Sequence, residues 1–175
     1  PGLSGVTIGY GYDLGFSTRE EFSKAWARHL PLPDFSLLAG ALGKKGQVAE
    51  AYSLKLRNVK PITKAQAREV FDRCTLPKYT RQAAQTFPGL EIFTDNQQGV
   101  LVSLVFNRGT DLTGDRRKEM MNIRNIIKSN DTLENKVKKV ANQFILMQRV
   151  WPSNDPQSGH PGLRRRRRAE GALFL

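Results

Sequence analysis

Residues able to do chemistry gather in the first fifteen positions of the chain. The stretch from Ser4 to Gly15 reads SGVTIGYGYDLG and places Thr7 and Asp13 among four glycines. Glycine permits tight turns and lets a ligand approach the backbone closely. The pattern therefore predicts a surface wall that presents a hydroxyl group and a carboxylate.

Two tyrosines, Tyr10 and Tyr12, lie between these polar residues. A tyrosine ring can stack on the face of a pyranose while neighbouring oxygens bond its hydroxyls, so this combination favours a sugar-binding wall. The alternative is a hairpin in which Asp13 only caps a turn. A dinucleotide site or P-loop fits poorly, because no helix is expected directly after Gly11.

The element that must position these residues is a short strand or hairpin over 5–10, bounded by Gly11 and Gly15. The next residues, Ser17 to Glu20, fit a capping box at the start of a helix that runs to about His29. In this interpretation Glu20 is the capping partner of Ser17.

The remaining chain reads as helical. Asp34 is expected to cap a short helix ending near residue 43, and Thr63 to cap another that ends at Cys74. Further helices are expected over 48–56, from Thr94 or Asp95 to 108, and over 120–127, 133–147 and 163–174, with a loop over 153–162. The predicted class is α+β, mainly α, with one small β element near the N-terminus.

Size and composition limit the remaining possibilities. The 175 residues, 39% of them hydrophobic, suit one domain or two small lobes, and no apolar run is long enough to span a bilayer. One cysteine excludes an intrachain disulfide, and with two histidines no dense zinc site is visible, so we expect neither a metal nor a cofactor. The net charge of +12 predicts attraction to polyanions, either nucleic acid or anionic bacterial envelope polymers.

Three segments, in the same order as in the family, resemble the phage-type, T4-lysozyme-like muramidases. The stretch 6–15 is similar to their active-site β-hairpin, and most similar to the branch found in bacteriocin toxins such as pesticin and in type VI secretion effectors. Residues 99–109, GVLVSLVFNRG, resemble the central helix of the family. Trp151-Pro152, then 161–163 and the arginine run leading to 173–174, resemble its C-terminal helix.

The resemblance implies a lysozyme-like fold with an N-terminal lobe over about 1–60 and a helical lobe over about 61–175, which includes the central helix near 95–108. It implies hydrolysis of the β-1,4 bond between N-acetylmuramic acid and N-acetylglucosamine. An acid with a raised pKa protonates the leaving oxygen, while a base or a positioned water attacks the opposite face of the sugar. The residues carried over are Thr7 and Asp13 as catalytic groups, Tyr10, Gly11, Tyr12, Asn107 and Arg108 as substrate contacts, and Arg166 and Arg167 as groups that fix the catalytic carboxylate or the lobe interface.

The chain departs from the family pattern at the general acid. The family glutamate lies in a helix before the hairpin, but no glutamate precedes Thr7 in this chain, which begins at Pro1. We therefore assign the general acid to no residue present, expect it to lie in a truncated upstream segment, and expect the chain as given to have little activity.

The resemblance also implies a setting: an antibacterial toxin domain, effector or endolysin that acts on peptidoglycan in the periplasm or cell wall of target bacteria. An immunity protein or a delivery partner is possible, whereas a specific nucleic acid or a membrane span is not expected. Two alternatives stay open, a non-catalytic peptidoglycan-binding relative and a basic nucleic-acid-binding module. The run of five arginines from Arg164 to Arg168 favours the nucleic-acid-binding module. The other interpretation of this run is a solvated basic patch.

Overall fold

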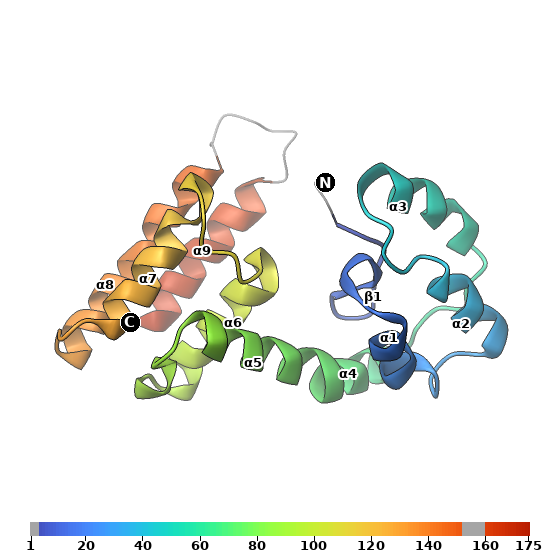
Figure 1. Cartoon of the computed structure of the whole chain (residues 1–175), viewed down its shortest axis with the longest axis horizontal. Coiled ribbons are helices and arrows are strands. Elements are labelled where there is room, and N and C mark those ends of the chain that lie inside the picture. The colour runs from blue at the N-terminus through green and yellow to red at the C-terminus, as the bar shows by residue number, and fades with distance from the viewer. Residues whose placement is uncertain (1–3, 152–159) are drawn as a thin grey trace. The chain divides into compact units, whose positions relative to one another are not determined.

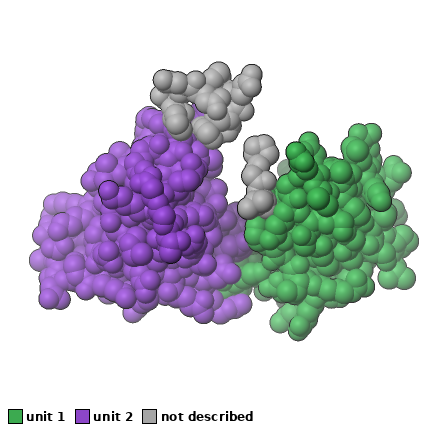
Figure 2. Space-filling model, turned by 45° about the horizontal axis from the view of Figure 1, so that its top comes forward, with its two compact units in different colours: residues 1–78 green, residues 79–175 purple. Residues whose placement is uncertain are grey.

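The computed structural model of the chain describes residues 4–151 and 160–175. The chain divides into two compact units, with the boundary after Lys78, as Figure 2 shows in green and purple. Helices dominate both units, and a two-stranded antiparallel sheet lies near the start of unit 1 (Figure 1). The predicted α+β, mainly α class is confirmed.

The sheet is the hairpin expected from the glycine pattern. Strand β1 covers Thr7–Ile8 and strand β2 covers Tyr12–Asp13, and they pair antiparallel. The turn between them contains Gly9 and Gly11, both with positive φ, which L residues rarely adopt. The short 3₁₀ helix η1, Leu14–Phe16, follows at once.

The helices of unit 1 surround a core that includes Phe22, Trp26 and Leu38. They are α1, Arg19–Trp26; α2, Leu32–Ala39; α3, Gly46–Ser53; and α4, Lys64–Val70, with the 3₁₀ helix η2, Leu54–Leu56, after α3. A capping box starts α1, but it uses Thr18 and Glu21, one residue later than predicted. Glu20 is therefore not the capping partner.

The expected cap of α2 at Asp34 is also wrong. Helix α2 begins at Leu32 with Pro31 at its N-cap, so Asp34 lies inside the first turn. Its carboxylate is buried and instead accepts a hydrogen bond from the backbone N–H of Lys60. Asp34 thus ties the loop before α4 to α2.

Helix α4 does not end at Cys74 as predicted. It passes through one π-helical turn, η3, Phe71–Thr75, into α5, Leu76–Thr86, whose first residues include Pro77. Pro77 has no N–H to donate, and it follows the π turn directly, where the regular helical hydrogen-bond ladder is already interrupted. The unit boundary falls within α5, after Lys78.

Unit 2 consists of helices around a larger core that contains Phe87, Leu104, Phe144 and Phe174. The elements are η4, Leu90–Ile92; α6, Asp95–Arg108; η5, Asp115–Arg117; α7, Lys118–Lys128; α8, Leu133–Leu146; η6, Met147–Val150; and α9, His160–Phe174. The expected central helix is α6, which starts with a Thr94–Gln97 capping box and ends at Gly109 with φ 76°.

Helices α8 and α9 lie side by side (Figure 1), and a glycine lets them approach closely. A Cβ on Gly171 would lie 3.1 Å from the carbonyl oxygen of Ala141. Helix α9 begins three residues before the predicted start, and most of the predicted loop 153–162 lies outside the described residues. Within 4–151 and 160–175, no helix combines the length and apolarity needed to cross a membrane.

Candidate active site

The hairpin brings the two predicted catalytic residues together. Thr7 and Asp13 are direct partners across the two strands. Residues opposite each other on an antiparallel pair project their side chains from the same face of the sheet. Thr7 is exposed and Asp13 is half-buried, so one face of the hairpin presents a hydroxyl group beside a carboxylate.

The carboxylate of Asp13 is held by backbone N–H groups. Its Oδ1 accepts from Gly15 at 2.8 Å and from Gly5 at 3.1 Å, while Oδ2 accepts from Gly5 at a longer 3.3 Å. The bond from Gly15 caps η1, so the capping role considered from the sequence is present. A carboxylate offers about four acceptor positions, which leaves Oδ2 with capacity for a further donor.

Two of the glycines are required by this close packing. A Cβ added to Gly5 would lie 2.3 Å from the backbone nitrogen of Gly15 and 2.5 Å from Asp13 Oδ1. A Cβ on Gly15 would lie 2.7 Å from the carbonyl oxygen of Lys44. All three distances are shorter than a van der Waals contact allows, so side chains at these positions would displace the backbone around Asp13.

The predicted substrate contacts of the hairpin differ in exposure. Tyr10 is 46% exposed, and its ring has an edge-to-face contact with Phe71 at 6.4 Å between centroids. Tyr12 is half-buried, and its ring packs edge-to-face on Trp26 at 5.8 Å. Tyr10 therefore offers a surface to a ligand, whereas the ring of Tyr12 belongs mainly to the core. Gly11, with φ 81°, forms the turn between them.

The glutamates that follow the hairpin do not have the properties of a general acid. Glu20 is exposed in the first turn of α1. Partial burial raises the pKa of Glu21, but the hydrogen bonds from Lys78 and from Thr18 outweigh it, and the net pKa lies below the usual value. A general acid needs a raised pKa, so Glu21 is unsuited to that role.

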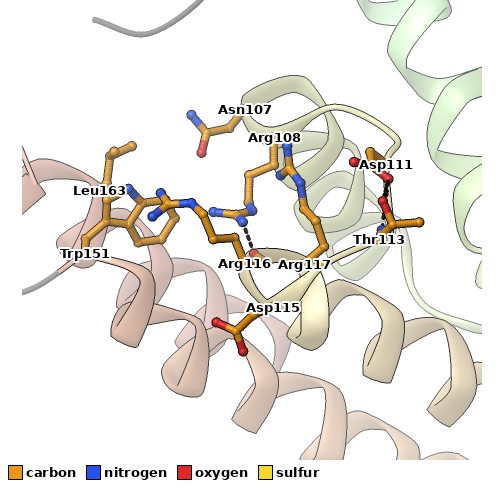
Figure 3. A pocket seen from close by; sticks show the side chains of 10 residues that line it. Asn107, Arg108, Asp111, Thr113, Asp115, Arg116, Arg117, Trp151 and Leu163 are labelled. Atoms are coloured by element: carbon orange, nitrogen blue, oxygen red, sulfur yellow. Dashed lines mark hydrogen bonds between the residues drawn. The ribbon is translucent and has the colours of Figure 1, made fainter.

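In unit 2, Asn107 and Arg108 end α6 beside a pocket of about 600 Å³ (Figure 3). Asn107 is exposed, whereas Arg108 is buried, with its guanidinium 4.9 Å from the ring centroid of Trp151. Burial lowers the pKa of Arg108 to about 10, and the positive charges of neighbouring arginines act in the same direction. Arg108 Nη2 donates to the carbonyl oxygen of Arg116.

Arg166, which is half-buried, and Arg167, which is buried, form an ionic network that links α9 to α6. Both pair with Glu170, about one turn further along the same helix, with Arg166 Nε 3.0 Å and Arg167 Nη2 2.8 Å from its carboxylate oxygens. Ser103 of α6 donates to the same carboxylate and accepts from Arg166. Arg167 is 0% exposed and its Nη2 also contacts Asn107 Oδ1 at 3.4 Å.

Sequence reasoning did not identify Glu170 or Ser103 as members of this network. The spacing of Glu170 from the two arginines, i+3 and i+4, is a visible signal of ion pairing on a helix. Nothing in the sequence indicates Ser103, because its contact depends on how α6 packs on α9. The five arginines do not form one solvated patch: Arg165 and Arg168 are exposed, while Arg164 donates to the carbonyl oxygen of Trp151 at 2.8 Å.

The structure thus gathers the candidate residues into two groups. Thr7, Tyr10, Gly11, Tyr12 and Asp13 lie in unit 1, on and around the hairpin. Asn107, Arg108, Arg166 and Arg167 lie in unit 2, at the junction of α6 and α9. Each group is a local cluster with its own hydrogen bonds.

Comparison with known proteins identifies the family. A model of the phage lysozyme family matches residues 39–170, which is most of the chain. The match covers α6 and the arginine run of α9, while the hairpin precedes it. No curated protein matches the chain significantly. The chain belongs to the phage lysozyme family, and thus to the lysozyme-type glycoside hydrolases that act on cell wall peptidoglycan.

Proposed function

We propose that the chain is a muramidase, which hydrolyses the β-1,4 bond between N-acetylmuramic acid and N-acetylglucosamine. The observation that carries the proposal is the register of the hairpin, in which Thr7 lies directly opposite Asp13. A hydroxyl group and a carboxylate on one face can hold a water molecule between them, as hydrolysis of a glycosidic bond requires.

In this proposal the two oxygens of Asp13 have separate roles. Oδ1 is held by two short bonds from backbone N–H groups, which fix the orientation of the carboxylate. Oδ2 accepts the proton of the water that attacks the anomeric carbon, and the hydroxyl of Thr7 orients that water. Tyr10, the more exposed of the two tyrosines, stacks on a sugar ring, while Gly11 and Tyr12 form the turn and wall beside it.

Asn107 and Arg108 are proposed as further substrate contacts. The amide of Asn107 is exposed and can exchange hydrogen bonds with sugar hydroxyl or acetamido groups. Arg108 adds a cation to the wall of the adjoining pocket. Arg166 and Arg167 are positioning residues, because their guanidinium groups are directed to Glu170, Ser103 and Asn107 and hold the end of α6 against α9.

The proposal assigns the general acid to no described residue. Glu20 is exposed on the first turn of α1, and hydrogen bonds lower the pKa of Glu21. We propose that the acid is a glutamate upstream of the hairpin, which is why the activity test uses the chain together with any residues that its gene encodes before Pro1.

The proposed setting is an antibacterial toxin or effector domain, or an endolysin, that reaches the wall from the periplasmic side. The net charge of +12 supports this setting, because a cationic protein meets an anionic envelope faster than a neutral one. A protein of this kind needs a delivery route into the target compartment, and an immunity protein if its producer has the same wall.

The experiment that tests the proposal is a clearing assay on purified sacculi with Thr7→Ala and Asp13→Asn in that longer chain. We expect each variant to lower the rate by about 100-fold or more, the usual effect of removing a group that handles a proton or orients the nucleophile. Asp72→Asn removes the same charge from an exposed i,i+4 pair with Arg68 and serves as the matched control. Asp13→Asn protein that is folded and clears sacculi as fast as Asp72→Asn protein would refute the roles proposed for the hairpin.

A further inference from the structure

The pocket beside Arg108 contains more positive charge than the proposed sugar contacts require. Arg108, Arg116 and Arg117 all line it, from the end of α6 and from η5. In Figure 3 the side chains of Arg108 and Arg116 extend toward the ring of Trp151, and that of Arg117 extends toward Arg108. The pocket lies entirely within unit 2.

The acidic residues near these arginines are engaged elsewhere. Asp111 and Asp115 also line the pocket, but the carboxylate of Asp115 pairs with Arg149 Nη1 at 2.7 Å. Glu119 is buried and also pairs with Arg149. Asp111 accepts from the backbone N–H of Thr113 at 2.9 Å and from its hydroxyl at 2.8 Å.

The three arginines have no such partner among residues 4–151 and 160–175, where none of them forms an ion pair with a carboxylate. Arg116 Nη1 donates to the carbonyl oxygen of Val150, at 3.5 Å. The Nε atom of Arg108 is buried without a hydrogen-bond partner in the same described part of the chain. Clustered cations of this kind repel one another, and the positive charges of Arg117 and Arg116 contribute to the lowered pKa of Arg108.

We propose that this pocket binds an oxyanion, a carboxylate or phosphate group carried by a small organic ligand. Guanidinium groups present paired N–H donors that match the oxygens of such groups, and an anion there relieves the repulsion among the arginines. Trp151 and Leu163 give the pocket an apolar wall for the rest of the ligand. The site extends the substrate contact proposed for Asn107 and Arg108 and rests on it, but binding is measured without hydrolysis, so the two proposals can fail separately.

The test is a titration of the full chain, followed in ¹H–¹⁵N spectra through the indole N–H of Trp151 and the Nε–H of the arginines, at constant ionic strength. Inorganic phosphate probes for a phosphate group, and N-acetyl-D-alanine, with its neutral amide as reference, probes for a carboxylate. We expect saturable shifts with at least one acid and none with the amide or with chloride. Whichever acid binds identifies the chemistry of the natural ligand.

The decisive variant is Arg116→Gln/Arg117→Gln, two residues that are exposed or half-buried and can be replaced without opening the core. We expect it to weaken binding by roughly 10- to 100-fold, as the loss of hydrogen bonds to a charged group does. Arg165→Gln/Arg168→Gln removes the same charge from the exposed side of α9 and should bind as the parent does. Arg116→Lys/Arg117→Lys keeps the charge without the paired donors and should bind with intermediate strength.

Two results would overturn the proposal. One is the absence of saturable shifts with both phosphate and N-acetyl-D-alanine in the parent protein, whose folding the same spectra report. The other is equal weakening by the pocket variant and by the α9 control, because that would assign the binding to net charge and not to the pocket.

Discussion

At the scale of single residues, the buried pair of Arg167 and Glu170 governs how α9 joins the rest of unit 2. Arg167 is fully buried, and Glu170 is the carboxylate that compensates its charge. A buried ion pair adds little net stability compared with apolar residues, but removal of one partner leaves an uncompensated charge in a low-dielectric site. The pair is therefore costly to break.

We predict that Glu170→Gln lowers the free energy of unfolding by about 3 to 5 kcal/mol, measured in urea, because Arg167 stays buried without its counter-charge. Arg168→Gln, on the exposed side of the same helix, is the control and should change stability by no more than about 0.5 kcal/mol. If both substitutions changed the free energy of unfolding by the same small amount, a group other than Glu170 would have to compensate the charge of Arg167.

The hairpin could be predicted from the sequence because its signal is local. Its glycines, Thr7 and Asp13 lie close together in the chain, and the structure adds the register that pairs Thr7 with Asp13. The sequence could not reveal that Arg108 would be buried against Trp151, because those residues are far apart in the chain. It also left open whether Asp13 caps a turn, and the contacts with Gly5 and Gly15 show that it does.

At the scale of elements, the ends of helices depend on caps that the sequence shows with an ambiguity of about one residue. Both Ser17 with Glu20 and Thr18 with Glu21 satisfy the capping-box spacing, and only the fold selects Thr18. The end predicted at Cys74 was wrong because a π turn carries the helix into α5. The long helix α6 was predicted more accurately, since a threonine cap and a terminal glycine bound it.

Two glycines of α6 give a matched prediction. Gly99 lies exposed inside the helix with open space around its Cβ position, so Gly99→Ala should raise the free energy of unfolding by about 0.5 to 1 kcal/mol. Gly109 also faces open space, but its φ of 76° is strained for alanine, so Gly109→Ala should lower stability by about 1 kcal/mol or more. Thermal unfolding with changes of the same sign in both variants would contradict this assignment of the helix end.

At the scale of the whole molecule, the chain consists of two units that each have a separate hydrophobic core. The composition predicted a chain able to form a real core, and the resemblance predicted two lobes, with a boundary near residue 60. Contacts place the boundary between the compact units after Lys78. The sequence offers no linker at that point because α5, a continuous helix, passes through it. The candidate catalytic residues and the oxyanion pocket thus belong to different units.

The family assignment rests on residues 39–170, whereas the catalytic proposal rests on the hairpin before them. One experiment can test the family assignment and the catalytic proposal together, namely identification of the glycosidic bond that the protein cleaves. A muramidase leaves N-acetylmuramic acid at each new reducing end, whereas cleavage of the alternate glycosidic bond leaves N-acetylglucosamine.

The most direct measurement is mass spectrometry of the fragments that the longer chain releases from purified sacculi, after borohydride reduction labels each reducing end. The account predicts reduced N-acetylmuramic acid at the new ends, and the loss of these products with Asp13→Asn but not with Asp72→Asn. Reduced N-acetylglucosamine at the new ends, or an unchanged yield of products from folded Asp13→Asn protein, would contradict it.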